Sequence, residues 1–136
     1  MKTGLIPGLK REETCVTTAE MRARQLTSDV FSTPAMIGLM EGTCVRLVEP
    51  FLDEHEQTVG THVDVRHRAP TRIGQSVTVK AELLETDGKR LRFSVEAWND
   101  GGIKIGAGTH RRVVIDTKGF AAGGDPTRTA SPNQRS

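Results

Sequence analysis

Residues 34–52, PAMIGLMEGTCVRLVEPFL, decide the fold, because they form the longest apolar segment of the chain. Thr33 followed by Pro34 is a helix start signal, since a Thr hydroxyl can cap free amides and Pro suits the first helical position. The segment leaves almost no polar face, so a helix here has to be wrapped by other elements. We therefore expect one long central helix that runs to about Leu52.

Glu41 lies in the middle of this segment, between Met40 and the apolar pair Cys44 and Val45. An unpaired carboxylate costs several kcal/mol in such surroundings, so we expect it to have a partner or a chemical role. Buried ionisable groups are common among catalytic acids and bases, although structural ion pairs are buried as well. Glu41 is therefore the first candidate for a functional residue, with a structural ion pair to an Arg as the alternative.

The rest of the chain follows the pattern of a sheet rather than of a helix. Alternation of apolar and polar residues predicts strands at residues 10–17, 59–67, 77–83, 91–97 and 103–116. Turn signals at Asp87 with Gly88 and at residues 99–102 join the last three strands as hairpins. Residues 18–32 form a polar connection that could be a short helix or a flap.

The order of the elements is one strand, the long helix and then four strands joined mainly by short turns. This order predicts an α+β domain in which an antiparallel sheet is wrapped around one central helix. We expect a single domain at residues 1–118 and a disordered tail at 119–136, which lacks periodicity and is rich in turn formers. A second copy would cover the exposed edge of the sheet, which predicts a homodimer, with a tetramer left open.

Composition excludes several kinds of partner. The net charge is only +2, and one Trp, no Tyr and four Phe give little aromatic surface for stacking bases, so we expect no nucleic acid. Glu41, Gly42 and Arg46 interrupt the apolar segment, so it does not predict a membrane span. Two cysteines in unlike surroundings, Cys15 and Cys44, and no signal segment predict a reduced, cytoplasmic protein.

Three segments together resemble a known family: TPAMIGLMEGTCVRLVEPFL at 33–52, VGTHVDVRH at 59–67 and IGAGTHRRVVI at 105–115. In this order and spacing they are similar to the hot-dog thioesterases of the fluoroacetyl-CoA thioesterase type, over roughly residues 31–115. The resemblance implies a hot-dog fold, a homodimer with its sites between the subunits, and hydrolysis of an acyl-CoA thioester without a metal. Coenzyme A is part of the substrate, so no separate cofactor is implied.

The resemblance also implies roles for single residues. It makes Thr33, Glu41 and His67 catalytic, and it places Gly60 and Arg112 at the substrate. The free pKa of His, about 6.5, suits proton transfer near neutral pH. The resemblance implies thioesterase chemistry on a small or medium acyl-CoA. The connection ahead of the helix looks shorter than its counterpart in the fluoroacetate enzyme, so fluoroacetyl specificity does not follow from the resemblance.

The residues themselves leave several roles open. Glu41 could be a nucleophile that forms an anhydride, or a base that activates water or Thr33. Thr33 could be an ordinary helix cap, His67 a structural histidine at a strand end, and Gly60 either an amide close to a carbonyl oxygen or a β-bulge. Eight helical residues rise about 12 Å, so Thr33 and Glu41 cannot meet on one regular helix. A site shared between two subunits removes this difficulty.

Two other functions fit the same expected fold. A hydratase or dehydratase would use a His and a carboxylate to move protons on the acyl chain and would leave the thioester intact. A non-catalytic acyl-CoA or small-ligand binding protein would use the same groove only to hold its ligand. Release of free thiol from an acyl-CoA separates the thioesterase from both.

Overall fold

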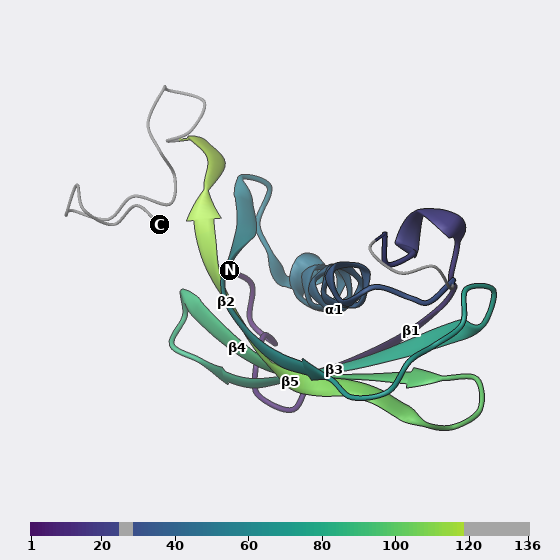
Figure 1. Cartoon of the computed structure of the whole chain (residues 1–136). Helices are drawn as coiled ribbons and strands as arrows, with labels where there is room; N and C mark the ends of the chain where they lie inside the picture. Colours follow the sequence, from purple (N-terminus) through teal and green to yellow (C-terminus); the bar gives the residue numbers. More distant parts are fainter. Residues whose placement is uncertain (25–28, 119–136) are drawn as a thin grey trace.

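A computed structural model describes residues 1–24 and 29–118 of the chain. Helix α1 (Thr33–Val48) lies on the concave side of one curved antiparallel sheet, as Figure 1 shows. The predicted α+β architecture, a sheet curved around one long helix, is confirmed. The tail predicted at 119–136 lies outside the described residues, so the predicted domain limits stay a prediction.

The sheet has five strands in the order β1-β3-β4-β5-β2. Their bounds are Lys10–Val16 for β1, Glu56–His67 for β2, Ser76–Thr86 for β3, Arg90–Asn99 for β4 and Lys104–Asp116 for β5. Short 3₁₀ helices, Ala19–Met21 (η1) and Glu49–Phe51 (η2), lie before and after α1. The strand that follows the helix, β2, is therefore an edge strand, and its outer edge is open to a partner.

The N-cap of helix α1 lies one residue earlier in the chain than the sequence predicts. Ser32, not Thr33, is the N-cap, and its hydroxyl accepts a hydrogen bond from the amide of Ala35 at 3.1 Å. The prediction of Thr33 as the cap is wrong because Ser32 has the extended backbone that a cap needs, and Thr33 is already helical. The hydroxyl of Thr33 is thereby left for another partner.

No helix in the described part of the chain is long and apolar enough to cross a membrane.

The core lies between α1 and the concave face of the sheet. The helix contributes Met36, Met40, Cys44 and Val48, all of them buried and four residues apart, so they form one stripe. A Cβ atom on Gly106 would lie 2.5 Å from the sulfur of Met36, so this glycine lets the helix approach β5 closely. The sheet contributes a layer of buried side chains, Val77, Val79, Ala81 and Leu83 from β3, and Leu91, Phe93, Val95 and Ala97 from β4.

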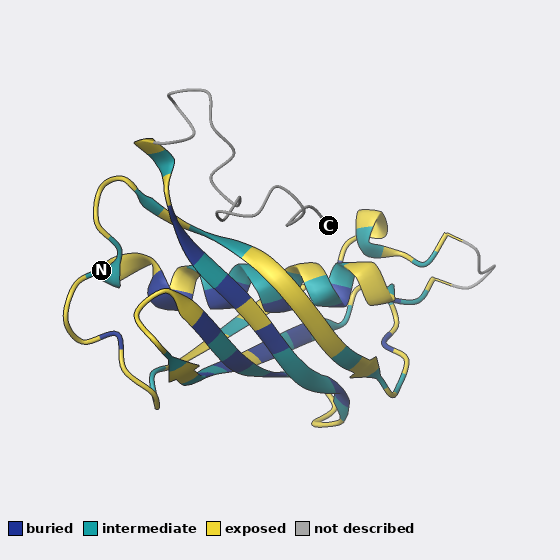
Figure 2. Ribbon diagram, turned by 90° about the vertical axis from the view of Figure 1, so that its left-hand side faces the viewer, coloured by how far each residue is buried: buried dark blue, intermediate teal, exposed yellow. Residues whose placement is uncertain are grey.

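The sheet covers only one side of the helix. Gly38 and Arg46 are exposed on α1, and Figure 2 shows exposed residues along the helix and along β2. The side chain of Glu41 is 39% exposed. The predicted burial of Glu41 on all sides is therefore wrong for the single chain, because five strands cover the stripe of Met36 and Met40 and leave the opposite side of the helix uncovered.

Candidate active site

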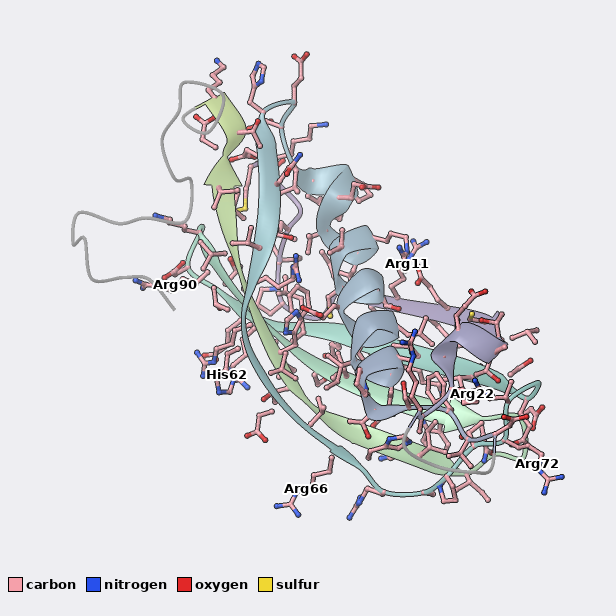
Figure 3. The ribbon with its side chains drawn as sticks, turned by 45° about the horizontal axis from the view of Figure 1, so that its top comes forward. Arg11, Arg22, His62, Arg66, Arg72 and Arg90 are labelled. Atoms are coloured by element: carbon pink, nitrogen blue, oxygen red, sulfur yellow. The ribbon has the colours of Figure 1, made fainter. Side chains whose placement is uncertain are left out.

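A β-bulge in β2 decides which residues face the helix. The pairing of β2 with β5 passes from Gly60 opposite Arg112 to His62 opposite Arg111, so Thr61 is the extra residue. Strict alternation places Gly60 on the outer face with His62, and that expectation is wrong. His62 points away from the helix in Figure 3, whereas a Cβ atom on Gly60 would point at Glu41. The bulge, one of the two alternatives for Gly60, is confirmed, whereas an amide that approaches a carbonyl oxygen stays a prediction.

Glu41 lies where α1, β2 and β5 meet. Its Oε2 atom is 3.6 Å from Nη1 of Arg112 and 3.7 Å from Nε2 of His110. A Cβ atom on Gly60 would lie 2.9 Å from the same oxygen, so only glycine leaves room for the carboxylate here. The sequence predicts a partner for Glu41, and Arg112 is that partner.

Arg112 is a buried cation that is held on several sides. Only 7% of the residue is exposed, and its Nε and Nη2 atoms donate hydrogen bonds to the Oγ1 and the carbonyl oxygen of Thr58, at 2.8 and 2.9 Å. Burial lowers the pKa of Arg112 and the charge of Glu41 acts against that shift, while a guanidinium stays protonated at neutral pH in any case. A fixed positive charge therefore lies beside the Glu41 carboxylate.

Thr33 and His67 form a second cluster at the first turn of α1. The hydroxyl of Thr33 is 2.8 Å from Nδ1 of His67, the last residue of β2. Phe31 packs edge-on against the imidazole, with ring centroids 6.2 Å apart. Burial lowers the pKa of His67, so its neutral form predominates at pH 7. Nε2 of His67 is buried and has no hydrogen-bond partner within residues 1–24 and 29–118.

The single chain does not bring the two clusters together. Thr33 contacts His67, and Glu41 contacts Arg112 and the backbone of Gly60, but no hydrogen bond or ion pair of the described residues joins Glu41 to His67. The rise of the helix separates the clusters by about 12 Å along its axis. All five predicted site residues are thus found on the helix side of the sheet, in two separate groups.

Sequence reasoning missed two residues of the Glu41 cluster, Thr58 and His110. His110 is 1% exposed and lies on β5 two residues before Arg112. Strand alternation places residues 108, 110 and 112 on one face, and this was the signal that could have assigned His110. Thr58 could not be found in this way, because the bulge interrupts the alternation of β2. In the described part of the chain, no three His, Cys, Asp or Glu side chains are grouped as metal ligands would be.

Comparison with known proteins connects this geometry to a family. The family described as fluoroacetyl-CoA-specific thioesterase, FlK, matches residues 12–118. A fluoroacetyl-CoA thioesterase of Streptantibioticus cattleyicolor is 47% identical over 94 residues, which cover 69% of this chain and 67% of that protein. A solved structure of the fluoroacetyl-CoA thioesterase FlK superimposes with a TM-score of 0.82 at 37% identity, over 88% of this chain and 95% of that chain.

More distant structures agree on the fold. A hot-dog-like protein from Thermanaerovibrio acidaminovorans matches with a TM-score of 0.78 at 23% identity, over 86% of this chain and 88% of that chain. The hot-dog fold that the resemblance implied is therefore confirmed, as is the family itself. This chain belongs to the fluoroacetyl-CoA-specific thioesterase family, and it is a thioester hydrolase with a hot-dog fold.

Proposed function

We propose that this chain hydrolyses small or medium acyl-CoA thioesters to a free acid and coenzyme A. The observation that carries the proposal is the Glu41 cluster, a carboxylate 3.6 Å from a buried guanidinium and beside a glycine that leaves its oxygen uncovered. One mutant of FlK has been solved with fluoroacetate and CoA, and another with acetyl-CoA, which supports a short acyl group. CoA enters as part of the substrate, and the reaction as proposed needs no separate cofactor and no metal.

Glu41 has two possible parts in the reaction. As a nucleophile, its oxygen attacks the thioester carbonyl and the C–S bond breaks, which leaves an anhydride that water then opens. As a base, it takes a proton from water while the water oxygen attacks the same carbon. Both routes need an ionised carboxylate, and the guanidinium of Arg112 lies 3.6 Å from it. In the base route the C–S bond breaks and the thiolate takes the proton that Glu41 removed from water, whereas in the nucleophile route it takes a proton from solvent.

His67 and Thr33 are proposed to complete the site from a second copy of the chain. β2 is an edge strand, and its residues 60–64 are all exposed. If two β2 strands pair in antiparallel fashion around this exposed run, the partner subunit's His67 comes level with Gln57, the neighbour of Thr58 in the Glu41 cluster. The proposed assembly is a homodimer with two shared sites.

A thiol-release assay on the purified chain tests the proposed chemistry. The substrates are acetyl-, fluoroacetyl-, butyryl-, benzoyl- and palmitoyl-CoA, and free CoA is followed with a thiol-reactive chromophore. We expect turnover of at least one short acyl-CoA, and about a 100-fold or larger loss of kcat in Glu41→Gln. The variant keeps the size of the side chain and removes its charge.

Two results would refute the proposed chemistry. Binding of the acyl-CoAs without any thiol release would identify a binding protein, and full activity in Glu41→Gln would remove Glu41 from the site. Hydration of an enoyl-CoA without thiol release would favour a hydratase.

A cytoplasmic location stays a prediction from the sequence.

A further inference from the structure

His110 is a buried histidine for which the chemistry above has no role. It is 1% exposed, and its ring stacks on Phe93 of β4 with centroids 6.3 Å apart and an interplanar angle of 27°. On the other side, its Cε1 atom would lie 3.2 Å from a Cβ atom on Gly60. The ring is thus fixed between the core of the sheet and the Glu41 cluster.

The two nitrogens of the ring have contacts that define one tautomer. Nδ1 lies 2.8 Å from the carbonyl oxygen of His62, which can only accept, so Nδ1 carries the hydrogen. Nε2 lies 3.1 Å from Nη1 of Arg112, which can only donate, so Nε2 presents its lone pair. The contact with Arg112 requires a neutral imidazole, because an imidazolium carries a hydrogen on Nε2 as well. Burial lowers the pKa of His110 and acts in the same direction, and the nearby charge of Arg112 adds to this.

This tautomer fixes the end of Arg112 that reaches Glu41. Thr58 accepts hydrogen bonds from Nε and Nη2 of Arg112, and the lone pair of His110 accepts one from Nη1. Nη1 is also the atom that lies 3.6 Å from Oε2 of Glu41. Because the guanidinium is planar, its two hydrogen bonds to Thr58 leave it a tilt about the Nε–Nη2 edge, and the acceptor at position 110 prevents this tilt from moving Nη1 away from the carboxylate.

We infer that His110 is a positioning residue, which holds Nη1 of Arg112 against Glu41 and so keeps the carboxylate correctly placed. It does not itself exchange protons with the substrate, because Nδ1 is bound to a backbone carbonyl and Nε2 is bound to a cation. Its role in turnover rests on the proposed thioesterase function. Its tautomer and its contact with Arg112 do not, so these can be tested separately.

The activity test compares two replacements of similar size. Gln places an acceptor near the position of Nε2 and can still receive the hydrogen bond of Arg112, whereas Asn places its amide near Nδ1 and offers Arg112 nothing. We expect His110→Asn to lower kcat by roughly 10-fold with KM within about 2-fold, and His110→Gln to retain most of kcat. His55→Asn, a change at an exposed histidine, is the matched control and should leave kcat unchanged.

A double-mutant cycle separates positioning from packing. In an Arg112→Gln background, His110→Asn should reduce kcat by less than about 2-fold further, because the residue it acts through is gone. Equal losses in both backgrounds, or equal losses for Asn and Gln, would overturn the inference and make His110 a packing residue.

An NMR spectrum of the wild-type protein tests the inference without an activity measurement. In ¹⁵N-histidine-labelled protein at pH 7, the two-bond ¹H–¹⁵N correlations of His110 should show the neutral Nδ1–H tautomer, and the Nε2 signal should move in Arg112→Gln. The Nε2–H tautomer or an imidazolium at pH 7 would overturn the inference. An inactive wild-type protein with the expected spectrum would refute the proposed function alone.

Discussion

Gly60 shows at the scale of one residue how an absent side chain makes room for a site. A methyl group there would lie 2.9 Å from the Glu41 oxygen and 3.2 Å from both Nη1 of Arg112 and the His110 ring. We expect Gly60→Ala to displace these groups and to lower kcat by about 10-fold or more, with little change in the melting temperature, because Gly60 is exposed and has no positive φ. Thiol-release kinetics and thermal unfolding measure the two effects.

The helix offers a matched control for this substitution. Gly38 is exposed on α1, and a Cβ atom there would have no neighbour within 4 Å. Gly38→Ala should keep full activity and stabilise the protein by roughly 0.5–1 kcal/mol, as alanine does in helix interiors. If Gly60→Ala were as active as Gly38→Ala, the contact between Gly60 and the carboxylate would have no part in catalysis.

His67 gives a second prediction at this scale. Burial lowers its pKa from the ordinary value of 6.5, so the ring should lose its proton at a pH below 6.5 and be neutral throughout the physiological range. A titration of the His67 ring by NMR measures the midpoint directly. A midpoint above 6.5 would contradict the burial of the ring in the protein in solution.

At the scale of elements, the carboxylate of Glu13 on β1 forms hydrogen bonds with side chains of α1. Glu13 accepts hydrogen bonds from Nε and Nη2 of Arg46 at 2.7 and 2.8 Å, from the Thr43 hydroxyl at 3.0 Å and from Arg11 at 2.6 Å. The hydrogen bonds of Arg46 are the main reason that the pKa of Glu13 falls to about 2. The carboxylate therefore stabilises the folded chain in its ionised form.

The direction of the pH dependence follows from that shift. Because the pKa of Glu13 in the folded chain lies below the ordinary value of 4.5, its contribution to stability is complete above about pH 4.5 and is lost as the pH falls toward 2. Glu13→Gln should lower the free energy of unfolding at pH 7 by roughly 1–2 kcal/mol, after a discount for the partly exposed Arg partners. Urea unfolding at pH 7 and pH 3 measures both values, and the difference between variant and wild type should shrink at pH 3.

A neighbouring carboxylate on the same strand controls for charge. Glu12 is 63% exposed on the other face of β1, and its only ion pair among the described residues is with Lys80 at 3.9 Å. Glu12→Gln should change the free energy of unfolding by less than about 0.5 kcal/mol. Equal effects of the two substitutions would show that net charge, not the contact with α1, accounts for the loss in Glu13→Gln.

The elements also show what the sequence can and cannot predict. The helix and all five strands follow from their periods, and the turn at Gly88 from its Asp-Gly pair. The bulge at Thr61 does not, because alternation gives no sign of an inserted residue, and it turns Gly60 from the outer face to the inner one. Local pattern therefore predicts which elements form, whereas inter-strand pairing decides which side chains meet.

At the scale of the whole molecule, the predicted site residues of one chain lie in two groups rather than in one. The apolar segment around Glu41 predicts a helix covered on all sides, but the sheet of one chain covers only the stripe around Met40. Sequence alone could not show this, since burial by a partner and burial by the same chain leave the same pattern in the residues. The open edge of β2 is where a second copy would pair.

The central claim is a site that takes Glu41 from one subunit and His67 from the other, and mixed dimers test it most directly. Chains carrying Glu41→Gln and His67→Ala are co-expressed with different affinity tags, and the heterodimer is isolated by two successive affinity steps. Each homodimer should be inactive, whereas the heterodimer should show about half the wild-type rate of thiol release, because one of its two sites is complete. A pure heterodimer that is as inactive as either homodimer would contradict the account.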